Sequence, residues 1–116
     1  MKIAFADIET DSLDPKEIVL VCFTTVDTDD PKYEVNQVLT DTSAVLRNCS
    51  KVMDCDFVVF HNGVGFDVPA LKNVGQWNFD NVQILDTLLL SRMLCPDRKA
   101  HSLESWGKTF GLLPGS

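Results

Sequence analysis

Apolar residues occur first in short runs and later at helical intervals along the chain. Short apolar or alternating runs bounded by turn residues are typical of strands, whereas apolar positions three or four apart are typical of helices. On this basis we expect strands at residues 2–8, 17–26, 32–39, 57–61 and 82–85. Helices are expected at residues 41–53, from residue 68 onward, at 86–94 and at 102–110.

The order of these elements predicts one mixed sheet. Three strands in succession favour an antiparallel meander, and the later alternation of strands and helices favours parallel strands joined by right-handed crossovers. The chain has no internal repeat, low-complexity tract or linker. We therefore expect a single α/β domain over residues 1–116, in which helices flank the sheet. The apolar spacing of Leu103, Trp106 and Phe110 favours a helical face that belongs to the core over one that stacks against bases.

Composition and charge narrow the class of protein. Of the 116 residues, 45% are hydrophobic and 23% are charged, which is ordinary for a globular domain and excludes a disordered tail. No apolar run approaches the ~20 residues that cross a bilayer, and the first residues resemble a strand and not a signal peptide. We therefore expect a cytoplasmic protein without membrane contact. The net charge of −7 argues against tight binding of nucleic acid by bulk charge.

A carboxylate pair near the start of the chain is the first candidate for chemistry. In a strand, residues two apart project to the same face, so Asp7 and Glu9 would lie about 6–7 Å apart. Such like charges repel unless a cation lies between them, and oxygen ligands of this kind suit Mg²⁺ or Mn²⁺. The alternative is a solvated strand end with no metal.

A second candidate segment follows the strand expected at residues 57–61. His61 and Asn62 precede a turn with two glycines, and Phe66 and Asp67 follow at the start of a helix. Asp67 is either a metal ligand or a helix cap, because a helix N-terminus favours a negative charge without any metal. Phe66 belongs either to the core or to a surface that stacks against a nucleobase.

Together these segments resemble two motifs of the DEDD, or DnaQ-like, 3′–5′ exonucleases. The motifs are Asp7-Ile8-Glu9 and Asn62-x-x-x-Phe66-Asp67. The later stretches, residues 85–92 and 101–107, are similar to the proofreading exonuclease domains of family A DNA polymerases. The sequence around Asn62 resembles that of the polymerases of short-tailed bacteriophages. The resemblance covers nearly the whole chain in the expected order.

This resemblance implies a ribonuclease H-like sheet and a two-metal site. Asp7, Glu9 and Asp67 would be the catalytic carboxylates and would hold two Mg²⁺ or Mn²⁺ ions. The implied reaction is hydrolysis of the terminal phosphodiester at the 3′ end of single-stranded DNA, which releases nucleoside 5′-monophosphates. The substrate-binding residues implied are Thr10, His61, Asn62 and Phe66.

Asp86 is expected to support structure near the site. In the family that this chain resembles, the matching aspartate stands at a strand-to-helix junction, and helix capping explains the position equally well. The third family motif, led by tyrosine or histidine with an aspartate four or five residues later, has no match in this sequence.

The unmatched motif leaves two interpretations. We expect either a C-terminally truncated exonuclease that lacks its final helix, or a non-catalytic or split module. Such a module would bind DNA, a DNA polymerase domain or a chain that supplies the third motif. A viral origin would place the protein in the host cytoplasm.

Overall fold

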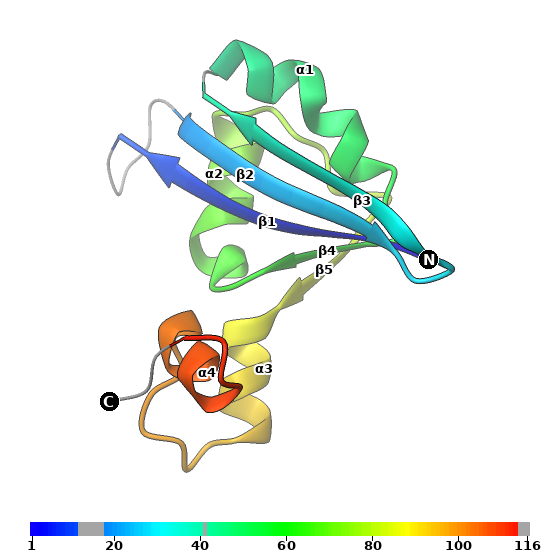
Figure 1. Ribbon diagram of the computed structural model, residues 1–116. Helices are drawn as coiled ribbons and strands as arrows, with labels where there is room; N and C mark the ends of the chain where they lie inside the picture. Colours follow the sequence, from blue (N-terminus) through cyan, green and yellow to red (C-terminus); the bar gives the residue numbers. More distant parts are fainter. Residues whose placement is uncertain (12–17, 41, 114–116) are drawn as a thin grey trace.

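A mixed sheet forms the centre of the computed structural model, which describes residues 1–11, 18–40 and 42–113 (Figure 1). Within these residues the sheet has five strands: β1 (Lys2–Thr10), β2 (Ile18–Asp27), β3 (Asp30–Leu39), β4 (Phe57–Phe60) and β5 (Gln83–Asp86). The spatial order is β3-β2-β1-β4-β5. The first three strands form an antiparallel meander, and β4 and β5 continue the sheet in parallel with β1. The predicted fold class is therefore confirmed.

The helices divide between one face of the sheet and its end. They are α1 (Thr42–Met53), the π-helical turn η1 (Gly63–Asp67), α2 (Val68–Asn73), α3 (Thr87–Leu94) and α4 (Leu103–Thr109). Figure 1 shows α1 and α2 against one face of the sheet, whereas α3 and α4 lie beyond the end of β5. None of the helices in the described ranges combines the length and apolar character that crossing a bilayer requires.

Two boundaries differ from the expectation in ways that affect the site. β1 runs to Thr10 instead of ending at Ile8, so Asp7 and Glu9 both lie within the strand. The turn expected after β4 forms a π-helical turn that leads directly into α2. Glu17, where the second strand was expected to begin, lies outside the described residues.

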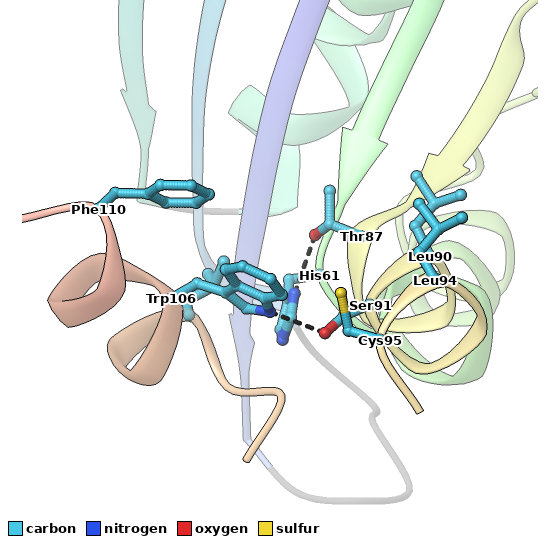
Figure 2. Close-up of a pocket in the computed structure, with 9 residues that line it drawn as sticks. His61, Thr87, Leu90, Ser91, Leu94, Cys95, Trp106 and Phe110 are labelled. Atoms are coloured by element: carbon cyan, nitrogen blue, oxygen red, sulfur yellow. Dashed lines mark hydrogen bonds between the residues drawn. The ribbon is translucent and has the colours of Figure 1, made fainter. Parts of the chain in front are cut away.

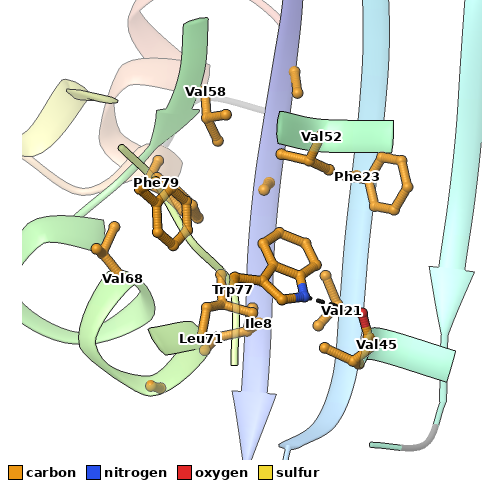
Figure 3. Packing of buried hydrophobic residues seen from close by; sticks show 14 of the residues in the cluster. Ile8, Val21, Phe23, Val45, Val52, Val58, Val68, Leu71, Trp77 and Phe79 are labelled. Carbon is orange, nitrogen blue, oxygen red and sulfur yellow. Dashed lines mark hydrogen bonds between the residues drawn. The ribbon is translucent and has the colours of Figure 1, made fainter. Parts of the chain in front are cut away.

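The core lies between the sheet and the two helices that cover it. On β1, Ala4, Ala6 and Ile8 are buried, and the residues that alternate with them are exposed on the other face. Trp77, in the segment after α2, fills the space between α2 and α1 (Figure 3). Its indole Nε1–H donates a 2.9 Å hydrogen bond to the carbonyl oxygen of Val45, which ties the segment after α2 to α1.

The apolar face of α4 is not part of this core, so that expectation is wrong. Leu103 is 59% exposed and Phe110 is 69% exposed, and no residue of α4 is buried. The apolar spacing predicts one apolar helix face, but it does not specify what covers that face. Because α4 lies beyond the end of the sheet, the described elements leave much of the face open.

The turn after β4 requires glycine at position 63. A Cβ atom at Gly63 would lie 2.2 Å from Cβ of Phe60, a buried core residue, whereas a Cβ at Gly65 would lie 3.1 Å from the side-chain oxygen of exposed Asn62. We expect Gly63→Ala to destabilise the fold by about 1–3 kcal/mol, the usual cost of overpacking a core, and Gly65→Ala to cost less than about 1 kcal/mol. Thermal denaturation followed by circular dichroism measures both. Equal losses would contradict this account of the turn.

Candidate functional site

Asp7 and Glu9 lie on the face of β1 that turns away from the core, where both are exposed. β1 and β4 are neighbours and parallel, with Phe5 opposite Val59. Asp7, on β1, and His61, directly after β4, both line one open cavity of about 680 Å³. Parallel pairing therefore brings the first candidate segment next to the second.

Asp67 reaches this end of the sheet from η1. Its side chain is only 6% exposed, and its Oδ2 atom is buried without a hydrogen-bond partner among the described residues. Although Asp67 stands at the start of α2, its side chain makes no capping hydrogen bond. The interpretation of Asp67 as a simple helix cap is therefore wrong, and its burial needs another explanation.

The pKa of Asp67 is raised to about 7. Burial is the main cause, because it penalises the charged form, and the neighbouring charge of Asp7 is the next. The charges of Asp86 and Glu9 act in the same direction, whereas the backbone N–H of Ile8 opposes them. Asp7, Glu9 and Asp67 therefore lie near enough to one another for their charges to interact.

Asp86 is equally buried, at 6% exposure, but its carboxylate is fully engaged. It accepts hydrogen bonds from the backbone N–H groups of Leu88 (2.9 Å) and Leu89 (3.4 Å), and so caps α3. It also accepts from Asn62 (2.9 Å) and Val64 (3.1 Å), which fixes the turn after β4. Burial alone would raise the pKa of Asp86, but these four hydrogen bonds outweigh burial and lower it. Asp86 thus supports the site through its hydrogen bonds.

Thr87 was not among the residues that the sequence indicated. Its hydroxyl donates to the carbonyl oxygen of Phe60 (3.1 Å) and lies 2.9 Å from Nδ1 of His61 (Figure 2). Because the single hydroxyl proton is used at Phe60, Thr87 accepts from Nδ1–H of His61, and in the neutral ring Nε2 is then an acceptor. A threonine directly after a capping aspartate is too common to have signalled this role.

The other predicted substrate-binding residues are more dispersed. Asn62 is exposed, and its backbone has a left-handed φ of 64°. Thr10 is half-buried at the end of β1, and Phe66 packs against the core. Of the predicted site residues, Asp7 and His61 line the open cavity, whereas Glu9, Thr10, Asn62, Phe66 and Asp67 are not among its lining residues.

The residues at this end of the sheet fit a divalent cation in their chemistry. All the candidate ligands are carboxylate oxygens, which hard cations prefer, and the unpartnered Oδ2 of Asp67 is the kind of atom that an ion would satisfy. As the side chains stand, no three His, Cys, Asp or Glu residues in the described part of the chain are close enough together to hold one ion.

The family-model match, over residues 4–107, shows that the chain belongs to the RNase H superfamily. It is similar to the DNA-directed DNA polymerases of Escherichia phage T7 and Enterobacteria phage T3, with 29% identity over 82 residues in each case. Each match covers 50% of this chain and 12% of the polymerase, so the chain spans a small part of these relatives.

Solved structures show the same fold. The family B DNA polymerase from Pyrobaculum calidifontis has a TM-score of 0.65 and 19% identity, over 97% of this chain and 18% of the polymerase. Exonuclease X, in complex with 5′ overhanging duplex DNA, has a TM-score of 0.59 and 19% identity, over 98% of this chain and 76% of that protein. The resemblance to DnaQ-like exonucleases is thereby confirmed, and the fold and the family support a nuclease function.

The buried charge of Asp67 predicts a pH-dependent stability. Because its pKa is about 7 in the folded chain and near 3.8 when unperturbed, the fold loses stability as the pH rises from about 4 to about 7. We expect Asp67→Asn to stabilise the metal-free protein by up to about 4 kcal/mol at pH 8, and by less than about 1 kcal/mol at pH 4. Thermal denaturation at both pH values measures this effect. Asp80→Asn removes the same charge from an exposed position and serves as the control. If Asp80→Asn stabilised the protein at pH 8 as much as Asp67→Asn, the prediction would be wrong.

Proposed function

We propose that residues 1–116 form a single exonuclease-like domain, or the front part of one, that hydrolyses DNA from its 3′ end in a proofreading role. The observation that carries this proposal is the buried, unpartnered carboxylate of Asp67 within range of the charges of Asp7 and Glu9. Burying such a charge is costly unless a cation compensates it. The phage polymerase relatives support DNA as the substrate class.

Asp7, Glu9 and Asp67 would hold Mg²⁺ or Mn²⁺ through their carboxylate oxygens. Bound divalent ions supply a water molecule of lowered pKa and stabilise charge on the attacking and leaving oxygens of the terminal phosphodiester. The products would be nucleoside 5′-monophosphates. The chain's own contribution begins with Asp86, whose hydrogen bonds hold the turn that carries Asn62.

The single-stranded 3′ end of DNA would bind next to these carboxylates, against Thr10, His61, Asn62 and Phe66. Thr87 orients the His61 ring, so that Nε2 accepts a hydrogen bond from substrate or water. Exonuclease X in complex with 5′ overhanging duplex DNA and E. coli Exonuclease I in complex with a dA16 oligonucleotide share the fold, which supports DNA as the ligand class. The reaction would take place in the cytoplasm, that of the host if the chain is viral.

A second candidate function is a non-catalytic or split module that binds DNA, a DNA polymerase domain or a chain carrying the third motif. Two observations favour it. The sequence contains no match to the tyrosine- or histidine-led third motif, and the described carboxylates are not gathered closely enough to chelate an ion as they stand. Under this interpretation the carboxylates would complete a metal site only in the assembled enzyme.

Release of mononucleotides from a 3′-end-labelled single strand, with Mg²⁺ or Mn²⁺, tests the proposal. We expect residues 1–116 to act slowly and a version extended through the next helical segment to act faster, because a misplaced ion loses transition-state stabilisation. Asp7→Asn and Asp67→Asn should lower the rate of the faster version by at least about 100-fold, the order of a lost electrostatic contribution. Asp86→Asn should leave most of the rate.

Two results of this assay would contradict the proposal. Equal metal-dependent rates from both versions, abolished by Asp7→Asn, would show that the third motif is not missing. A comparable collapse in all three variants, each still folded by circular dichroism, would show that Asp86 belongs among the metal ligands.

A further inference from the structure

An apolar groove separates α3 from α4 at the end of the molecule remote from α1. It has a volume of about 330 Å³. Figure 2 shows Leu90 and Leu94 of α3 on one side, and Trp106 with Phe110 at the end of α4 on the other. We call it the α3–α4 groove and define it by Leu90, Ser91, Leu94, Leu103, Trp106 and Phe110.

The groove lies within a larger exposed apolar surface. On α3, Met93 and Leu94 are each 75% exposed, and Leu89 beside them is also exposed. Leu112 and Leu113, after α4, continue the exposed surface. Exposed apolar surface of this extent on a small chain marks an interaction site.

The chain exposes more surface than a compact domain of its mass. A folded monomer of this mass exposes about 6,300 Å², whereas this chain exposes 7418 Å². The radius of gyration is 14.8 Å, compared with about 13.4 Å for a compact chain of this length.

Charge distinguishes this end of the chain from the rest. Residues 87–116 contain four basic residues (Lys and Arg) and two acidic ones (Asp and Glu), which gives a net charge of +2. Residues 1–86 contain six basic and fifteen acidic residues, which gives a net charge of −9. At the rim of the groove, the Arg98 guanidinium lies 3.7 Å from the centre of the Trp106 ring. Its hydrogen bonds within the described residues go to neutral oxygens of Ala100, Ser105 and Thr109. No described carboxylate neutralises this cation, so an acidic group on a partner would complement it.

We propose that the α3–α4 groove binds an amphipathic helix of a partner protein, with an apolar face and acidic flanks. A groove between two helices whose apolar faces are open accepts a third helix, which would bury the exposed leucines. The hydroxyl of Ser91 already bonds Nε1 of Trp106 (2.7 Å) and Nδ1 of His101 (2.6 Å), so the groove offers mainly apolar contact. This inference is independent of the proposed nuclease activity.

Two other occupants fit the surface less well. A second copy bound through the same face would bring two positively charged units together. A nucleic acid strand would leave the exposed leucines next to charged phosphates. An acidic amphipathic helix would bury the apolar surface with one face and would neutralise the charge of Arg98 with its acidic flanks.

A pair of synthetic peptides tests the proposal on the whole chain. Each has about three heptads with leucine along one face, and the polar positions are glutamate in one peptide and lysine in the other. We expect fluorescence anisotropy of the labelled peptides to show that the glutamate peptide binds at least about ten-fold more tightly. Leu94→Gln, in the groove, should weaken its binding about ten-fold, as loss of a central apolar contact does.

The matched control is Val64→Gln in η1. Val64 is 51% exposed and lines neither the groove nor the cavity that adjoins it, so this substitution should change binding less than about two-fold. The proposal is overturned if the two peptides bind equally or not at all, or if both variants weaken binding alike. A dimer in sedimentation that Leu94→Gln dissociates would identify a second copy as the occupant instead. Displacement of the glutamate peptide by a single-stranded oligothymidylate would identify nucleic acid.

Discussion

The burial of two carboxylates, Asp67 and Asp86, is the constraint on which the functional end of this sheet depends. Asp67 and Asp86 are equally buried, yet the pKa of Asp67 is raised to about 7 and that of Asp86 is lowered. Four backbone N–H groups satisfy Asp86, whereas Oδ2 of Asp67 has no partner among the described residues and the charge of Asp7 lies nearby. The backbone thus compensates the buried charge of Asp86, whereas the charge of Asp67 needs a group from outside the described chain.

The fold brings Asp7 and Asp67 to the same end of the sheet from distant parts of the sequence. β1 pairs in parallel with β4, and the π-helical turn η1, which follows β4, carries Asp67 towards β1. The groove between α3 and α4 adjoins this region, because His61, Thr87 and Leu103 line both the groove and the cavity that contains Asp7. A helix bound in the groove would therefore lie beside the end of the sheet that carries the carboxylates.

Local patterns predicted the sheet well, because alternation, apolar runs and turn residues act over a few positions. The parallel pairing of the later strands followed from crossover rules. The π-helical turn did not follow, since it depends on the close approach of Gly63 to Phe60. Nor did the exposure of Leu103 and Phe110, because helical spacing predicts an apolar face without saying what covers it. The link from Thr87 to His61 joins residues far apart in sequence.

The pKa of Asp67, measured from its carboxyl carbon resonance by NMR, tests the central claim most directly. The account predicts a midpoint near pH 7 in the metal-free protein and a clear decrease when Mg²⁺ is added, because a bound cation favours the charged carboxylate. A midpoint near 3.8 that Mg²⁺ does not change would contradict it.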